Sequence, residues 1–230
     1  MESDLIRRNV TALLAQLPER VELVAAAKGR TPDEVLAAVQ AGVKIVGENY
    51  VKEAKQAHSL VGREARWHFI GTLQKHNLRR NVLELFDMIE SVDSLEMARE
   101  IDRKCASLGR TMPVLIEVNS AREARKSGVL PDEVEQLVRE MAGLQSVRVM
   151  GLMTMGPVLA DPQQYRPYFR QTRRIFESLG RLNLTDVQMR YLSMGMTDSY
   201  RVALDEGANV VRIGTGIFGP RITCNLDMSV

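Results

Sequence analysis

The sequence repeats one pattern eight times: a short apolar run is followed by a segment with helical spacing or by a polar loop. This alternation is typical of parallel α/β folds, in which each strand leads into a crossover helix. The predicted strands span residues 21–28, 44–49, 66–71, 88–92, 113–119, 147–153, 191–194 and 209–213. Eight such units, preceded by one predicted helix over residues 3–16, indicate a (β/α)8 TIM barrel with an extra N-terminal helix.

Capping residues mark where several of the helices begin and end. Thr31 and Pro32 supply an N-cap and a first-turn proline, and Gly42 stands where the helix that they begin ends. The predicted helices span residues 31–42, 50–60, 73–86, 94–108, 162–179 and 197–207, and one more begins near residue 131.

No change in composition and no Pro- or Gly-rich linker divides the 230 residues, so we expect a single domain over residues 1–230. The alternative fold is a doubly wound open sheet, which normally carries a Gly-rich turn after its first strand. Here that position reads Lys28-Gly29-Arg30-Thr31. The barrel is therefore the favoured interpretation.

Charge and composition exclude several classes of protein. The formal net charge is +2, from 31 Lys+Arg against 29 Asp+Glu, which does not indicate a surface for nucleic acid or membranes. No stretch approaches the roughly 18 apolar residues of a membrane span, and the N-terminal segment lacks the apolar region of a secretion signal. Cys105 and Cys224 have neither metal-type nor redox-type spacing. We expect a cytoplasmic, monomeric protein without a metal.

Lys28 is the most informative candidate for chemistry, because active sites of TIM barrels lie at the carboxyl ends of the strands. It follows Ala25, Ala26 and Ala27 at the end of the first strand. Loss of hydration at the end of an apolar strand favours the neutral, nucleophilic amine, which can form a Schiff base with an aldehyde. The alternative is a lysine that only extends into solvent.

The segment after the eighth strand is a candidate phosphate site beside Lys28. Gly214, Thr215 and Gly216 allow backbone N–H groups to approach an anion, and the loops after strands seven and eight are the usual phosphate site of this fold. Ser193 and residues 197–199 add hydroxyl or backbone donors. A phosphate site beside an amine suits pyridoxal 5′-phosphate (PLP). The alternative is a tight turn that closes the barrel.

Other polar residues carry weaker signals. The three histidines, His58, His68 and His76, form no convincing metal constellation, and His68 is expected to be a packed or hydrogen-bonded strand residue. Lys126 follows the fifth strand and could take part in cofactor transfer, although a solvated loop lysine is the simpler interpretation. Arg170, Arg173 and Arg174 have helical spacing and are expected to form a solvated face.

Seven segments, in the same order, resemble the pyridoxal phosphate homeostasis protein family, which has the barrel of the alanine racemase N-terminal domain. The matching segments, which together span almost the whole chain, are VELVAAAK, VGENYVKE, WHFIGTLQ, KSGV, GLMTMGP, LSMGM and VRIGTGIFG. The resemblance implies a cofactor-binding set in which Lys28 forms the Schiff base, Arg212 meets the pyridine nitrogen, Ser193, Gly214 and Thr215 hold the phosphate, and Asn49 lines the pocket. It also implies a carrier or buffer that maintains the PLP supply, with no established turnover and with PLP-dependent apoenzymes as acceptors.

The chain departs from these families at three places. Ala27 replaces the serine that usually precedes the lysine, and LQKHN, with His76 and Asn77, stands where LQ-x-NK is usual. Alanine racemases carry a tyrosine four residues after the lysine, where this chain has Pro32. These changes affect contacts at the rim of the predicted site and leave the attachment lysine in place.

The predicted partner of the pyridine nitrogen argues for binding without turnover. Enzymes that use PLP as a strong electron sink place a carboxylate on this nitrogen, whereas an arginine cannot accept its proton. Related racemases take a second base from an extra domain, and we expect the barrel to occupy all but about ten C-terminal residues. Two alternatives stay open: a low-activity racemase or lyase acting on amino acids, and a cofactor-free barrel enzyme that binds a ketose phosphate through Lys28.

Overall fold

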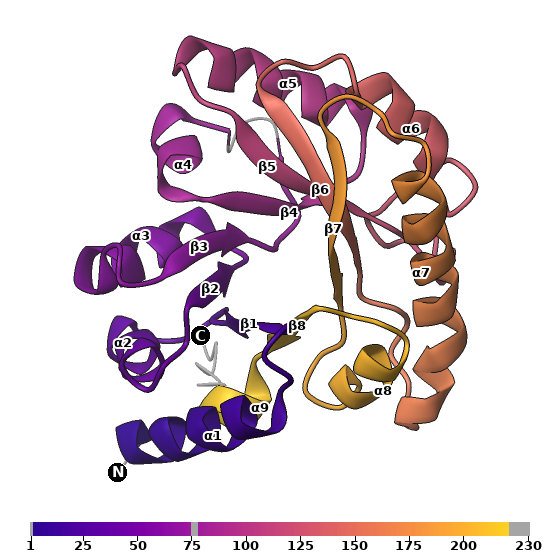
Figure 1. Cartoon of the computed structure of the whole chain (residues 1–230). Coiled ribbons are helices and arrows are strands. Elements are labelled where there is room, and N and C mark those ends of the chain that lie inside the picture. Colours follow the sequence, from indigo (N-terminus) through magenta and orange to yellow (C-terminus); the bar gives the residue numbers. More distant parts are fainter. Residues whose placement is uncertain (1, 75–77, 221–230) are drawn as a thin grey trace, which may run out of the picture.

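A computed structural model describes residues 2–74 and 78–220 of the chain. Its strands form a closed parallel barrel in which each strand pairs with the next and the last pairs with the first (Figure 1). The strands are β1 (Glu22–Ala26), β2 (Ile45–Glu48), β3 (Arg66–Phe69), β4 (Met88–Val92), β5 (Met112–Glu117), β6 (Val147–Thr154), β7 (Val187–Met194) and β8 (Val210–Ile213). The predicted (β/α)8 barrel is confirmed.

Helices surround this barrel, and α1 lies beside α9 and α2 (Figure 1). They are α1 (Glu2–Gln16), α2 (Pro32–Gln40), α3 (Val51–Val61), α4 (Arg80–Leu85), α5 (Leu95–Ser107), α6 (Val134–Met141), α7 (Arg166–Gly180), α8 (Tyr200–Asp205) and α9 (Thr215–Phe218), with a 3-10 turn η2 (Pro162–Tyr165) before α7. The N-cap predicted at Thr31 forms and is part of a capping box: Glu34 N–H donates to Thr31 Oγ1 over 3.3 Å, and Thr31 N–H donates to Glu34 Oε2 over 2.7 Å. No helix among the described residues has the length and apolar character needed to cross a membrane.

Two local predictions were wrong. The helix expected from residue 73 begins only at Arg80, although Leu73 and Leu78 before it are buried apolar residues. β7 begins at Val187, four residues before the predicted strand, since its first half alternates between half-buried and exposed residues. The segment after β8 contains the short helix α9. His76, Asn77 and Cys224 lie outside the described residues.

Two kinds of core hold the barrel together. Apolar residues on the outer faces of the strands pack against the helices, and Cys105 is buried among them as a free thiol. Inside the barrel are small apolar clusters, one of which contains Val24, Ile45 and Val210. Nearer the carboxyl ends of the strands the interior becomes polar, because His68 and Arg212 are also buried there. This polar layer lies directly beneath the predicted site.

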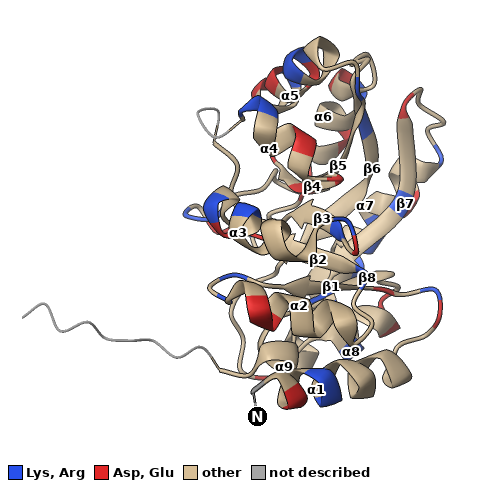
Figure 2. Cartoon of the chain, turned by 90° about the vertical axis from the view of Figure 1, so that its left-hand side faces the viewer, with Lys and Arg blue, Asp and Glu red and all other residues tan. Residues whose placement is uncertain are grey.

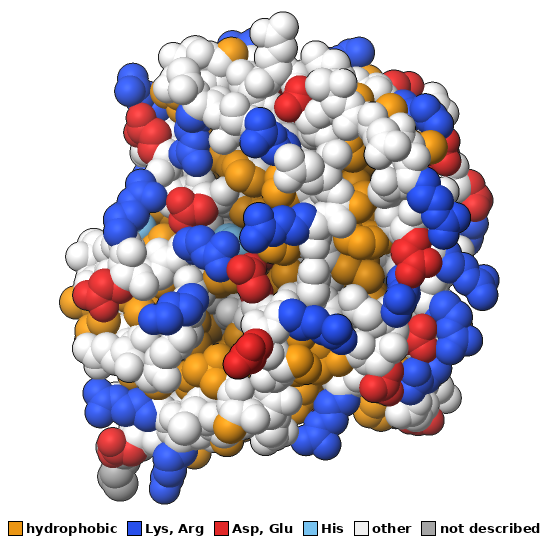
Figure 3. Space-filling model, in the orientation of Figure 1, with side chains coloured by type: hydrophobic (Ala, Val, Ile, Leu, Met, Phe, Trp, Pro, Cys, Tyr) orange, Lys and Arg blue, Asp and Glu red, His pale blue; other side chains and the backbone are white. Residues whose placement is uncertain are grey.

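Charged side chains are distributed over the surface rather than separated by sign. Figure 2 shows Lys and Arg beside Asp and Glu on the outer helices, and Figure 3 shows blue and red side chains interspersed over one face. Many of them form ion pairs along a helix, such as Arg139 with Glu135 on α6. Positive and negative charges, which nearly balance in the sequence, therefore also lie next to each other on the surface.

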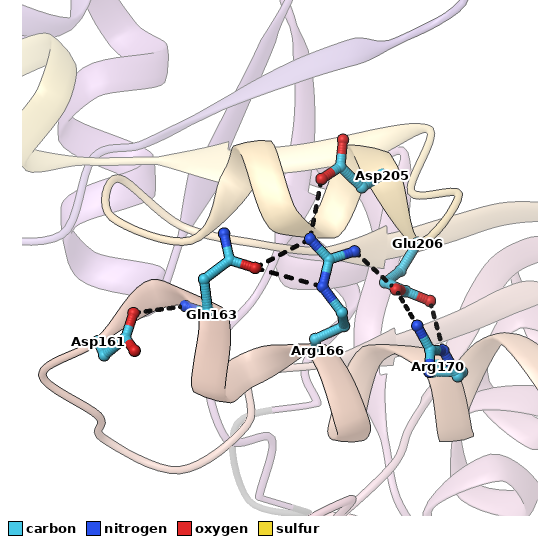
Figure 4. A network of polar contacts seen from close by, with 6 residues as sticks. All are labelled: Asp161, Gln163, Arg166, Arg170, Asp205 and Glu206. Atoms are coloured by element: carbon cyan, nitrogen blue, oxygen red, sulfur yellow. Dashed lines mark hydrogen bonds and ion pairs between the residues drawn. The ribbon is translucent and has the colours of Figure 1, made fainter.

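One group of polar contacts joins α7 and its preceding turn to α8 (Figure 4). Glu206 accepts hydrogen bonds from Arg166 at 2.8 Å and from Arg170 at 2.9 and 3.1 Å, and Arg166 also donates to Asp205 and Gln163. We call Gln163, Arg166, Arg170, Asp205 and Glu206 the helix-layer network. The solvated face expected along α7 is consistent with the exposure of Arg170 and Arg173, whose side chains are 52% and 44% exposed while they pair with Glu206 and Glu177.

Candidate functional site

Lys28 lies two residues beyond β1, at the carboxyl end of the barrel. Its side chain is half-buried, and Nζ lies 5.3 Å from the centroid of the Tyr50 ring. The following residue, Gly29, has a φ of 70° and donates its N–H to Glu53 Oε2 over 2.8 Å. A left-handed glycine and a carboxylate on α3 therefore hold the turn that positions Lys28.

The glycine loop after β8 lies beside the strand that carries Lys28. The register pairs Ala25 with Ile213, and a Cβ added to Gly214 would lie 3.2 Å from the carbonyl oxygen of Ala26. A Cβ at Gly216 would lie 2.9 Å from Ile213 Cγ2 and 3.2 Å from Thr197 Cγ2. The loop therefore approaches its neighbours closely, and only glycine at these two positions leaves that space open.

Two threonines line this loop. Thr215 Oγ1 donates to Thr197 Oγ1 over 3.0 Å, and Gly216 N–H donates to the same Thr197 oxygen over 3.1 Å. Thr215 is exposed and Thr197 half-buried, so both hydroxyls are accessible from the mouth of the barrel. Hydroxyl and backbone N–H donors that converge beside glycines form an anion-binding concavity.

Beneath the loop, four buried side chains from four strands form a hydrogen-bonded chain. Arg212 Nη1 donates to Ser193 Oγ over 2.5 Å, Ser193 donates to Glu90 Oε2 over 2.7 Å, and His68 Nδ1 lies 2.7 Å from Glu90 Oε1. Arg212 also donates to the Thr154 carbonyl over 2.9 Å. We call His68, Glu90, Ser193 and Arg212 the interior network. Its members are at most 4% exposed, so its charges are compensated by one another rather than by water.

The partners of Glu90 reverse the effect of its burial. Burial alone would raise the pKa of this carboxyl, but the contacts with His68, Arg212 and Ser193 outweigh it and lower the pKa below its ordinary value. Burial lowers the pKa of Arg212, and the carboxylates of Glu90 and Glu117 oppose that shift. The network therefore keeps a carboxylate and a guanidinium together inside the barrel.

Two other acidic groups near the mouth are shifted in the opposite direction. Burial, and then the charge of Asp93, raise the pKa of Glu117 to about 7, while Arg212 opposes the shift. Burial, and then the charge of Glu53, raise the pKa of Glu48 to about 8. Both oxygens of the Glu48 carboxyl lack a hydrogen-bond partner among the described residues. Glu48 is thus a buried carboxyl held mainly in its neutral form near pH 7.

The structure divides the predicted site residues into three groups. Lys28 and Asn49 line one cavity of about 690 Å³, together with Tyr50, Phe69, Thr72 and others. Gly214 and Thr215 belong to the loop beside Lys28, and Ser193 and Arg212 belong to the interior network. Because the Ser193 hydroxyl is occupied by Glu90 and Arg212, its role as a phosphate contact stays a prediction.

Lys126 and His68 both have hydrogen-bond partners in the structure. Lys126 Nζ donates to Glu123 over 2.7 Å and to the carbonyl of Gly156 over 3.2 Å, beside a second cavity of about 300 Å³. The prediction of a hydrogen-bonded strand residue at His68 is confirmed. In the part of the chain that the structure describes, no three His, Cys, Asp or Glu residues group as metal ligands would.

Sequence reasoning missed two residues of this region. Glu90 interrupts the apolar run MIESV, and a charged residue inside a buried strand is a signal that something must compensate it. Thr197 was considered only as part of residues 197–199, whereas its hydroxyl contacts both Thr215 and Gly216. Neither contact follows from spacing, because the partners come from distant strands.

Comparisons with known proteins identify a matching family and its relatives. The family described as alanine racemase, N-terminal domain, matches residues 1–221. A pyridoxal phosphate homeostasis protein of Aquifex aeolicus is 37% identical over 201 residues, covering 87% of each chain. Another, from Pasteurella multocida, is 35% identical over 211 residues, covering 90% of each.

Solved structures extend these comparisons. PipY of Synechococcus elongatus, solved with PLP bound, aligns with a TM-score of 0.85 and 30% identity over 93% of this chain and 100% of that one. An alanine racemase of Clostridium difficile aligns with a TM-score of 0.78 and 16% identity, over 96% of this chain and 61% of that one. The second alignment concerns the fold alone.

Proposed function

The chain belongs to the pyridoxal phosphate homeostasis proteins, within the alanine racemase N-terminal domain family, and from this premise we propose that it binds PLP through Lys28 as a carrier or buffer of the cofactor. The observation that carries the proposal is the position of Lys28 beside the Gly214–Gly216 loop. An amine and an anion-binding loop on adjacent strands suit a small molecule that carries an aldehyde next to a phosphate. On the sequence grounds given above, the proposed compartment is the cytosol and the proposed state a monomer.

The described residues fit PLP at both ends. Thr197 and Thr215 offer hydroxyl donors to a phosphate, and the missing side chains of Gly214 and Gly216 leave room for it. Lys28 is only half-buried and Thr215 is exposed, so the proposed site opens to the outside of the barrel. This access is what exchange of the cofactor with PLP-dependent apoenzymes, the proposed acceptors, would require.

When bound, PLP supplies an aldehyde carbon and an electron-withdrawing ring. Lys28 Nζ is the group that would hold the cofactor through that carbon, and such an attachment would be covalent and reversible. Glu53 holds the turn after Lys28 through the Gly29 N–H, and the ring of Tyr50 packs near Nζ. These contacts restrict the lysine before the cofactor arrives, which reduces the entropy lost on attachment.

The proposed role of the interior network is to present Arg212 as a fixed, charged donor toward the ring nitrogen. An arginine cannot take up the proton that a carboxylate would share with this nitrogen. The ring would then withdraw electrons weakly, which favours holding the cofactor over amino-acid turnover. Ser193 and Glu90 supply the hydrogen bond and the counter-charge that keep Arg212 buried.

The test is the visible spectrum of the purified protein after incubation with PLP and removal of free cofactor. We expect wild type to retain an absorption band that borohydride abolishes, Lys28→Ala to lack it, and Lys126→Ala, a matched removal of a nearby lysine, to keep it. A colourless wild type, or a Lys28→Ala protein with the wild-type band, would overturn the proposal.

Turnover is tested separately by exchange of the α-proton of amino acids with deuterated water. Exchange near the free-cofactor background is expected, because the ring would be a weak electron sink. Exchange at enzyme-like rates would instead favour a racemase or lyase.

A further inference from the structure

The cavity beside Lys28 contains positive charge that the proposed attachment of PLP does not use. Its volume is about 690 Å³, and Lys52, Lys55 and Arg79 line it in addition to Lys28. No Asp or Glu is among the residues that line it in the described part of the chain. The two added lysines come from α3 and the arginine from the start of α4, so the cavity lies on the β2–β3 side of Lys28. The glycine loop lies on the other side of Lys28, after β8.

In the ranges that the structure describes, these three cations lack the carboxylate partners that several other surface cations have. Arg80, the neighbour of Arg79, pairs with Glu84 over 2.8 Å along α4, and Arg103 pairs with Glu100 over 2.8 Å along α5. Within residues 2–74 and 78–220, no ion pair or side-chain hydrogen bond engages Lys52, Lys55 or Arg79. The helix positions that usually supply a partner are not acidic: Gln56 and Ser59 stand four residues after Lys52 and Lys55.

The placement of the two lysines on α3 is electrostatically unfavourable by itself. Lys52 and Lys55 are separated by one helical turn, and like charges at this spacing repel each other. The acidic residue between them, Glu53, points its carboxylate to the Gly29 N–H. Figure 2 shows blue segments on α3. An anion in the cavity would relieve this repulsion.

We propose that this cavity binds a small polyanion, with two or more phosphate or carboxylate groups, at a site separate from the cofactor phosphate. Lys52 and Lys55 supply point charges, and Arg79 supplies a planar fork suited to an oxyanion. Asn49, Thr72 and Gln74 add hydrogen-bonding groups to the wall, and Phe69 and Val82 add apolar surface. This inference does not depend on covalent attachment at Lys28, since the site is present in the protein without cofactor.

Calorimetric titration of the PLP-free protein with inorganic pyrophosphate, and in a second arm with citrate, tests the proposal. We expect wild type to bind at least one of the two, and the variant Lys52→Gln/Lys55→Gln/Arg79→Gln to bind it at least about tenfold more weakly, or about 1.4 kcal/mol. The probe that binds more tightly, pyrophosphate or citrate, shows whether the cavity prefers phosphate or carboxylate groups. The PLP band of this variant is expected to match that of wild type.

Two further variants separate this site from general charge effects and from the cofactor loop. Arg8→Gln/Arg20→Gln/Lys44→Gln removes the same charge from exposed positions outside the cavity and is expected to bind like wild type. Thr197→Ala/Thr215→Ala, in the glycine loop, is expected to weaken PLP binding and to leave polyanion binding unchanged. The proposal is overturned if wild type binds neither probe, if the cavity variant binds like wild type, or if the loop variant loses polyanion binding.

Discussion

The interior network and the helix-layer network each place a glutamate close to arginine, but in different surroundings. Glu206 accepts hydrogen bonds directly from Arg166 and Arg170. Glu90 is linked to Arg212 through the hydroxyl of Ser193. Glu90 and Arg212 have side chains that are 0% and 4% exposed, inside the barrel. Glu206 is 8% exposed, whereas its partners Arg166 and Arg170 are 31% and 52% exposed. The interior network exchanges water for protein partners on every side, and the helix-layer network keeps its arginines in contact with solvent. Figure 4 shows the contacts of the helix-layer network.

This difference predicts how each network responds to the loss of one partner. A buried charge that loses its counter-charge has no water to replace it, and breaking such a pair costs about 3–5 kcal/mol. An exposed arginine that loses its carboxylate is rehydrated, so exposed pairs contribute about 0–1 kcal/mol. The interior network can therefore hold Arg212 rigidly beneath the proposed cofactor site, while the helix-layer network mainly joins α7 to α8.

The largest expected effect is that of Glu90→Gln. Removal of the carboxylate takes the charge of Glu90 away from the buried Arg212, and the free energy of unfolding is expected to fall by about 3–5 kcal/mol in urea titrations. The double variant Glu90→Gln/Arg212→Met removes both charges and is expected to be more stable than Glu90→Gln. A loss below about 1 kcal/mol in the single variant would show that the interior network behaves like a surface pair.

Glu48 extends the comparison to a buried carboxyl without partners. In the unfolded chain its pKa is about 4.3, whereas in the folded protein burial and Glu53 raise it to about 8. Between these values the folded state holds a proton that the unfolded state has lost, so stability falls as the pH rises through this window. The wild type is expected to lose about 2–4 kcal/mol of this contribution between about pH 5 and about pH 8.

Glu48→Gln does not titrate and is expected to remove the contribution of Glu48 to this pH dependence, measured by urea unfolding at a series of pH values, while the contribution of Glu117, whose pKa is raised to about 7, remains. Glu64→Gln, at an exposed position, serves as the control and is expected to follow the wild-type curve. If the unfolding free energy of Glu48→Gln depends on pH as steeply as that of wild type, burial does not raise the pKa of Glu48 in the folded protein.

Glu206→Gln has a smaller expected effect than either buried glutamate. The hydrogen bonds from Arg170 and then Arg166 lower the pKa of Glu206, so its stabilisation is present above about pH 4.3 and is lost as the pH falls further. Because both arginines are partly exposed, the cost at neutral pH is expected to be about 1 kcal/mol. A cost equal to that of Glu90→Gln would remove the distinction between the two networks.

Salt gives the smallest and most selective effect. Raising NaCl from about 0.05 M to about 0.5 M shortens the distance over which exposed charges interact to a few ångströms. The cost of Glu206→Gln is expected to fall by about half under this change, whereas the cost of Glu90→Gln should stay constant. Equal salt dependence in the two variants would contradict the difference in burial.

The features that could be predicted from the sequence are local ones. The capping box at Thr31 and Glu34 involves residues within one helical turn, and Lys28 and Gly214 each follow an apolar run, so their positions at strand ends were readable. The start of α4 was not readable, because Leu73 and Leu78 are buried apolar residues that lie before the helix.

The interior network could not be predicted because its contacts join distant parts of the chain. Ser193 and Glu90 lie 103 positions apart, and the closure of the barrel brings them within 2.7 Å. The sequence places Ser193 at the end of a predicted strand, but it does not show that the hydroxyl faces another strand. For the same reason the contact between Thr197 and Thr215 required the structure.

The central claim is that Lys28 is the residue to which PLP attaches. Mass spectrometry of the PLP-loaded protein, reduced with borohydride and digested, tests it most directly. The account predicts one reduced cofactor adduct, on the peptide that contains Lys28, and none on the peptide that contains Lys126. An adduct on Lys126, Lys52 or Lys55 with an unmodified Lys28 would contradict it.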